Sequence, residues 1–281
     1  MANHSRFIFK IIITFLICFV LIQLIPSVAI PNADSILTAA TFLFSVLYGF
    51  EISVVIGNFS QLKTQIAIQN ASLLSVYHLA GIIGGETETQ IKTAVENYLL
   101  RIIDLPLEQH LLGASKEFFA IFEPLKTVPD GDGQERGQAI QYMNEGLYYM
   151  PQSRNQIADV APKFVDAPVW LMLFVLAAIL VGVLFINAGA GFLSIFAATI
   201  FATTVVGSLF LLDEIDSNRI QEAHLEYDVF NETLLALGLL PYYPDFALKS
   251  GIIKARRGEK YRLGTFPKYP SLDERVVQTV V

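Results

Sequence analysis

The sequence has few charged residues and a single cysteine. Charged side chains make up 16% of the 281 residues and hydrophobic ones 53%, and the mean hydropathy is +0.51. A soluble domain rarely shows this composition, because its surface needs polar groups. Cys18 is the one cysteine, which excludes an intramolecular disulfide. The 19 basic residues are outnumbered by 26 acidic ones, which excludes the basic character of nucleic-acid-binding proteins. The composition therefore indicates an integral membrane protein.

Motifs of enzymatic chemistry are also missing. The chain contains no nucleotide-binding glycine fingerprint, paired-cysteine metal site or serine elbow. The segment PDGDG (129–133) begins like a calcium loop, but Glu135 stands at the loop's glycine position and Gln141 at its bidentate glutamate position. Glu222 and His224 point about 200° apart on a helix, so they do not converge on a metal. We therefore expect no catalytic residue, no metal site and no cofactor.

What the sequence does contain is four apolar runs of membrane length, since a transmembrane helix needs about 20 mostly apolar residues. They lie at 11–30, 36–57, 169–186 and 192–212. Short connectors, PNADS and NAGAG, join the runs in two pairs. The expected fold is all-α: a polytopic membrane protein with four transmembrane helices in two hairpins and a helical cytoplasmic domain.

The distribution of basic residues predicts the orientation. Neither connector contains Lys or Arg, so the positive-inside rule places both termini in the cytoplasm and the protein in the cell membrane. The expected parts are a first hairpin at 1–57, a cytoplasmic helical domain at 58–165, a second hairpin at 166–212 and a cytoplasmic tail at 213–281. A second interpretation of residues 1–29 is also open: Arg6 and Lys10, an apolar core and Ser27-Val28-Ala29 resemble a cleaved secretory signal.

Helix signals continue through the cytoplasmic parts. Thr87 and Gln90 form a capping-box pattern, followed by an apolar face and a stop at Pro106. A further helix is expected near 135–149, and Ser153 as the cap of a short one after it. In the tail we expect an amphipathic helix capped by Ser217.

The tail contains a basic stretch. Its basic residues are Lys254, Arg256, Arg257, Lys260 and Arg262. On the cytoplasmic side these side chains would attract anionic lipid headgroups. The competing interpretation is a solvated run of charge.

The second apolar run contains one carboxylate, Glu51. On a helical wheel Glu51 shares one side with Thr41, Ser45 and Tyr48, and the same stripe continues to Asn58. A charge inside the bilayer costs about 2.5 to 3.5 kcal/mol at the helix centre. We therefore expect this side to face protein or water, as in a pore, a bundle centre or an oligomer axis. The other interpretation is that Glu51 bonds a neighbouring span and only fixes packing.

Acidic residues also end the fourth run. Asp213, Glu214 and Asp216 lie where the run leaves the membrane, and the first and last share a helical face. They are candidates for holding or attracting a cation. An ordinary solvated helix end is the alternative.

Three segments stand out: GFEISVVIGNFSQLKTQIAIQNASLLSVYHLA, which runs off the second span, SRNQIADVAPKFVDAPVW, which leads into the third, and LFLLDEID, which closes the fourth. Together they resemble the bestrophin-like domain family. Bestrophins proper are pentameric anion channels whose second span lines the pore, with an acidic calcium clasp after the last span. The resemblance implies that Tyr48 and Glu51 line a pore and that DEID occupies the clasp position. The sequence departs from the pattern, because an acid opposes anions and DEID is shorter and less acidic than a clasp.

Two functions follow as hypotheses. The first is a homo-oligomeric, channel-like membrane protein with the second span nearest the axis. The second is a non-conducting membrane anchor or scaffold whose cytoplasmic helices bind a partner. We do not expect an enzyme.

Overall fold

The computed structural model describes residues 2–26, 28, 31–126, 134–161, 165–189, 191–216, 227–251, 253–255, 258–272 and 274–280. It is 79% helical, which confirms the all-α class. The chain divides into two compact units. The first comprises Met1–Asn58 and Lys163–Ile220, and the second comprises Phe59–Pro162 and Gln221–Val281.

The first unit contains the four predicted spans. They belong to α1 (Ala2–Leu24), α2 (Ala33–Ile83), α8 (Ala167–Asn187) and α9 (Phe192–Asp216). All four are long and apolar enough to cross a membrane. The second span does not end at the expected boundary of 57, because α2 continues as one helix of 51 residues to Ile83.

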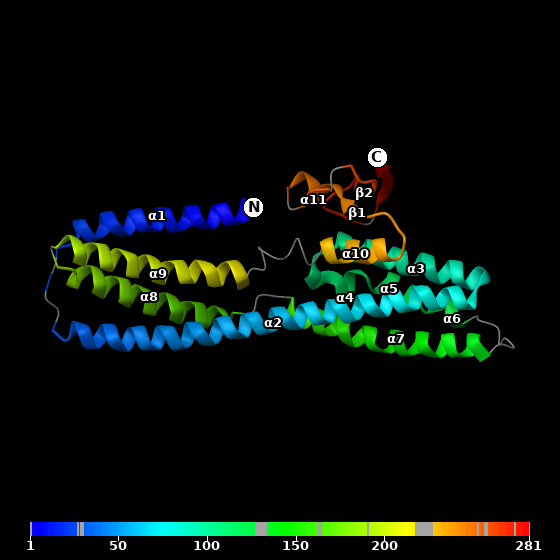
Figure 1. The fold of residues 1–281 in the computed structure, drawn as a ribbon, viewed down its shortest axis with the longest axis horizontal. Coiled ribbons are helices and arrows are strands. Elements are labelled where there is room, and N and C mark those ends of the chain that lie inside the picture. The colour runs from blue at the N-terminus through cyan, green and yellow to red at the C-terminus, as the bar shows by residue number, and fades with distance from the viewer. Residues whose placement is uncertain are drawn as a thin grey trace. The chain divides into compact units, whose positions relative to one another are not determined.

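Small residues on α9 bring its neighbours close. α9 packs along both α1 and α8 (Figure 1). Ala198 and Ala202 lie in one buried cluster with Cys18 of α1. At Gly207, an added Cβ would come 2.8 Å from Ile11 Cδ1 of α1. Short side chains at such contacts let helix backbones approach within a membrane, where the hydrophobic effect does not drive association.

The second unit packs two long helices, several short ones and three short strands with the later part of α2. The elements are α3 (Gly85–Asp104), η1 (Leu107–Gln109), α4 (His110–Gly113), α5 (Ser115–Ala120), α6 (Glu123–Lys126), α7 (Gln134–Val160), α10 (Val229–Ala236), β1 (Tyr242–Pro244), α11 (Asp245–Lys249), β2 (Tyr261–Thr265) and β3 (Val276–Val280).

The helix predicted from Thr87 exists, but its cap is different. α3 begins at Gly85, and its N-cap, Gly84, has a φ of 70° and makes no side-chain cap bond. Glycine adopts this left-handed conformation without the steric cost of a Cβ. Thr87 lies inside the helix, and Gln90 donates a hydrogen bond to Glu86. The capping-box prediction is therefore wrong, whereas the predicted apolar face is buried at Ile91, Val95, Tyr98, Leu99, Ile102 and Ile103.

The two helices predicted around 135–160 are one. α7 passes through Pro151 without interruption. Ser153 does not cap a new helix, because its hydroxyl donates to the Met150 carbonyl at 3.0 Å. Leu147 and Ile157 are buried on either side of the proline. Packing along the whole helix thus outweighs the local cost of a proline that lacks a backbone donor.

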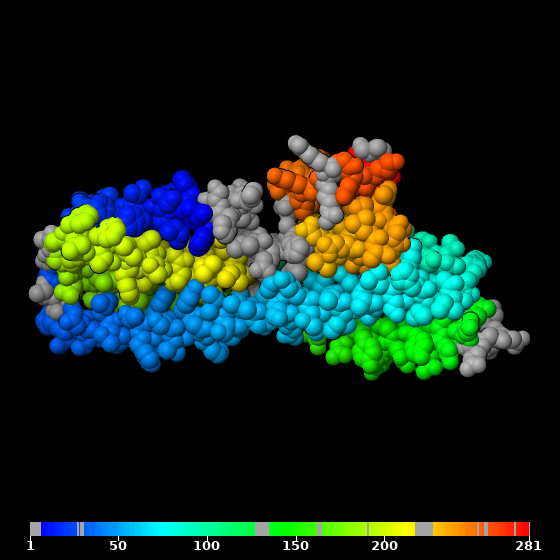
Figure 2. Space-filling model, viewed as in Figure 1, coloured from blue at the N-terminus to red at the C-terminus, as the bar shows by residue number. Residues whose placement is uncertain are grey.

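The tail adds a small sheet. The basic stretch was expected to be partly extended, but its pairing into a sheet was not predicted. The strand order of the sheet is β1-β2-β3, with β1 and β2 parallel and β2 and β3 antiparallel. In the space-filling view this C-terminal part, orange to red, lies against α10 and α3 of the same unit (Figure 2). The predicted cap Ser217, the PDGDG turn and the pair Glu222 and His224 lie outside the described residues.

Candidate functional site

Glu51 is buried inside the first unit. Its residue surface is 7% exposed. Val55, one turn later on α2, is fully buried in a cluster with residues of α8 and α9. Glu51 is on the same side of α2 and therefore lies on the side that packs against these two helices. A carboxylate placed there must be balanced by polar groups or by water, because burial of a charge is costly.

The other members of the predicted stripe have different surroundings. Tyr48 is half-buried, and its ring stacks on Phe44 at a centroid distance of 5.8 Å. Thr41 and Asn58 are half-buried, and Ser45 is exposed. The stripe thus turns from the packed side of α2 at Glu51 to an open side at Ser45.

Two further carboxylates lie near Glu51. Asp166, the N-cap of α8, and Asp216, the last residue of α9, both act electrostatically on it. Asp216 is 3% exposed and accepts hydrogen bonds from the Val165 amide at 3.0 Å and from Trp170 Nε1 at 3.4 Å. Asp166 was not predicted as part of this site, because nothing in the local sequence relates it to Glu51. Three carboxyl groups from three different helices thus lie close to one another in the first unit.

The predicted cation ligands at the end of α9 are not brought together. Asp213 is exposed, and Glu214 pairs with Lys10 at 3.3 Å. Asp216 instead points to Val165 and Trp170, as described above. Within the described residues, no group of three or more His, Cys, Asp or Glu side chains is placed to hold a metal ion.

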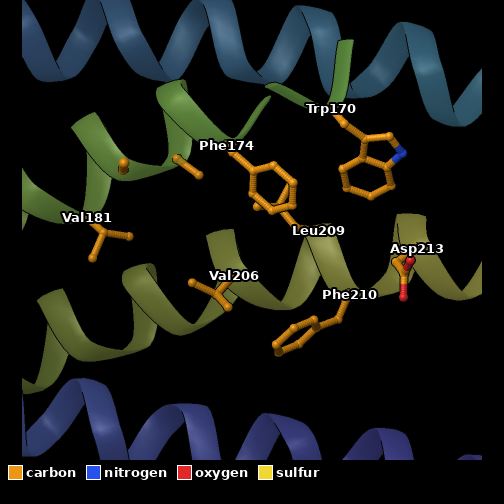
Figure 3. A pocket seen from close by; sticks show the side chains of 9 residues that line it. Trp170, Phe174, Val181, Val206, Leu209, Phe210 and Asp213 are labelled. Carbon is orange, nitrogen blue, oxygen red and sulfur yellow. The ribbon is translucent and has the colours of Figure 1, made fainter. Parts of the chain in front are cut away.

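A groove of about 700 Å³ runs between α8 and α9 (Figure 3). Its lining is almost entirely apolar, with aromatic rings from both helices. The residues that form it are Trp170, Phe174, Ala177, Ala178, Val181, Val206, Leu209, Phe210 and Asp213. Asp213 supplies the one carboxylate of this lining, on the same part of the groove as Trp170 and Phe210 (Figure 3).

Only some of the basic side chains of the tail are exposed and available to bind a ligand. Lys254 and Lys260 are exposed. Arg262 instead forms an ion pair with Glu96 and donates to the Leu240 carbonyl at 2.8 and 3.1 Å. Arg256 and Arg257 lie outside the described residues.

The second unit holds a buried polar cluster that sequence reasoning also missed. Asp104, 2% exposed, accepts a hydrogen bond from the Tyr242 hydroxyl at 2.6 Å and from Arg275 at 2.9 Å. Burial raises the pKa of Asp104 from 3.8 to about 6, although Arg275 and Tyr242 oppose this change. These contacts join residues more than 130 positions apart, so no local pattern reveals them.

His110, six residues after Asp104 in the sequence, is also buried. Its Nε2 is 3.0 Å from the Leu105 carbonyl. Burial lowers the pKa of His110 from 6.5 to about 4, because the protonated ring would lose its hydration. Arg154, 3% exposed, covers the same region: it donates to the Leu111 carbonyl at 2.7 Å and stacks on Phe118 at 4.0 Å. These groups fix the fold of the unit.

Comparison with known proteins adds one finding. The model of the Bestrophin-like domain family matches residues 33–217, which is more than half of the chain. No curated protein and no solved structure matches the chain. The match covers the long helix α2, the spans α8 and α9 and the carboxylates between them. This chain belongs to the Bestrophin-like domain family.

Proposed function

We propose that the protein is a homo-oligomeric ion channel of the cell membrane, with α2 nearest the oligomer axis. Membership of the family supports a membrane protein of this kind. The observation that carries the proposal is Glu51, a carboxylate 7% exposed within the membrane-length part of α2. Ionisable residues at such depth are costly and mark ion pathways in membrane proteins.

In this proposal the conducting path runs along α2. Thr41, Ser45, Tyr48 and Asn58, which keep exposed surface, are the candidates to line it. Glu51, on the packed side of α2, acts on it through its charge. Glu51, Asp166 and Asp216 give the path a negative potential, so cations pass in preference to anions.

Purified protein in liposomes tests the proposal. We expect an ion flux above that of empty liposomes, and a different flux for Glu51→Gln. The matched control is Glu108→Gln, which removes one exposed carboxylate of the second unit. A flux equal to that of empty liposomes would refute the channel hypothesis and favour the non-conducting membrane anchor or scaffold.

We further propose that both termini are cytoplasmic and that α1 is retained as a span. The absence of basic residues from both connectors supports the orientation. The close packing of α1 on α9 at Gly207 supports retention. On that side of the membrane, Lys254 and Lys260 would contact anionic lipids together with Arg256, Arg257 and Arg262. The mass of the protein in membranes tests retention, because cleavage would remove about the first 29 residues.

A further inference from the structure

The groove between α8 and α9 has the shape and surface of a site for a hydrocarbon chain. Its volume of about 700 Å³ lies within the range of ligand pockets, about 300 to 1,000 Å³. Phe174, on its wall, is 54% exposed, and its neighbour Val175 is 50% exposed. Both lie on a helix of membrane length. The medium next to this groove is therefore the hydrocarbon of the bilayer rather than water.

One end of the groove carries two opposite charges. Asp213 lines the groove and is exposed, and among the described residues it has no ion-pair or hydrogen-bond partner. Lys10 Nζ lies 5.7 Å from the centre of the Phe210 ring, which is also part of the lining. Lys10 pairs with Glu214, yet its side chain is still 42% exposed. This end thus presents a carboxylate and an ammonium group beside an apolar channel.

We propose that this groove binds a zwitterionic phospholipid from the surrounding leaflet. One acyl chain lies along Trp170, Phe174 and Phe210. The ammonium group of the headgroup pairs with Asp213, and the phosphate is attracted by Lys10. An anionic phospholipid offers the same chain and phosphate, but nothing that pairs with Asp213. The charge at the groove end therefore favours the zwitterionic headgroup.

The single tryptophan of the chain reports on this groove directly, because Trp170 is part of its lining. The experiment uses detergent-purified full chain and titrates two lipids with identical brominated acyl chains, phosphatidylethanolamine and phosphatidylglycerol. Bromine atoms that come close to Trp170 quench its fluorescence. We expect half-maximal quenching at a concentration of phosphatidylethanolamine about two- to fivefold lower than that of phosphatidylglycerol, which is the factor that an exposed ion pair supplies.

Variants separate the two parts of the site. In Asp213→Asn the preference should fall to about one, while quenching by both lipids remains. In Ala178→Phe, which fills the groove, quenching by both should weaken. Asp159→Asn removes an exposed carboxylate of the second unit and should change neither.

Several results would overturn the proposal. They are equal quenching by the two lipids in the wild-type protein, a preference for phosphatidylglycerol, or a preference that survives in Asp213→Asn. If Asp213→Asn fails to fold, the proposal is tested by the ratio of the two lipids' half-maximal quenching concentrations in the wild-type protein and by the quenching in Ala178→Phe. Absence of quenching by either lipid, together with a disulfide between two copies of Ala178→Cys, would show that a second copy of the chain covers the groove instead.

Discussion

Replacing Asp104 by Asn is expected to make the second unit lose stability as the pH falls from 6.5 to 4. The reason lies in two buried groups with opposite dependences on pH. The pKa of Asp104 is raised from 3.8 to about 6, so its contribution to stability is fully present below pH 3.8 and is lost as the pH rises through 6. The pKa of His110 is lowered from 6.5 to about 4, so its contribution is present above pH 6.5 and is lost as the pH falls through 4.

The two effects are similar in size. Each pKa unit corresponds to about 1.4 kcal/mol, so each group changes the free energy of unfolding by about 3 kcal/mol across this range. In the wild-type protein they offset one another. Asp104→Asn leaves the effect of His110, a loss of about 3 kcal/mol toward pH 4. His110→Gln keeps a donor for the Leu105 carbonyl and leaves the effect of Asp104, a gain of about 3 kcal/mol toward pH 4.

Thermal melting of the full chain in detergent measures these changes. Ten of the eleven tyrosines lie in the second unit, so tyrosine circular dichroism in the near ultraviolet reports on it. A change of about 3 kcal/mol corresponds to about 6 to 12 °C in Tm for a unit of this size. Trp170 fluorescence follows the first unit and serves as the internal control. The reasoning is refuted if both variants show the wild-type dependence on pH, or if their dependences are reversed.

Three other substitutions test the packing of the second unit by the same melting assay. Asn231→Ala should cost about 2 to 3 kcal/mol, because the Asn231 amide accepts from the Tyr242 amide at 2.6 Å and donates to its carbonyl at 3.0 Å, and both are buried; a loss below 0.5 kcal/mol would contradict this. Arg154→Lys should lower the free energy of unfolding by about 2 kcal/mol, since an ammonium group does not reproduce the planar guanidinium's contacts with the Leu111 carbonyl and the Phe118 ring. Unchanged stability would show that these contacts do not stabilise the unit. Gly264→Ala should destabilise the unit, because its Cβ would overlap the ring of Tyr242; a Tm equal to that of the wild type would show that the ring has room to move.

Much of the fold follows from local patterns. The four spans depend on the length of apolar runs, and the continuity of α2 on a periodic pattern that outlasts the membrane. The buried face of α3, including Tyr98, follows from helical spacing. All of these are properties of one contiguous segment, which is why a single sequence contains the information.

What could not be predicted depends on contacts between distant segments. Pro151 looks like a helix boundary, and only the burial of its neighbours explains why α7 continues. In the sheet, β2 pairs with both the preceding strand β1 and the following strand β3. The Tyr242 hydroxyl donates a hydrogen bond to Asp104, which lies 138 positions earlier in the sequence. The Glu51 side of α2 was expected to face protein or water, and in the structure it faces protein. Asp166 lies 115 positions away in the sequence and comes close to Glu51 only through the fold of the first unit.

The most direct test of the channel is a current recording from the purified protein in a planar bilayer under a salt gradient. We predict discrete conducting events with a reversal potential on the cation side, and a smaller cation preference in Glu51→Gln, because a negative charge next to the path is lost. Absence of conductance in bilayers that demonstrably contain the protein would contradict the channel. A reversal potential on the anion side that is unchanged by Glu51→Gln would contradict the role assigned to the carboxylate.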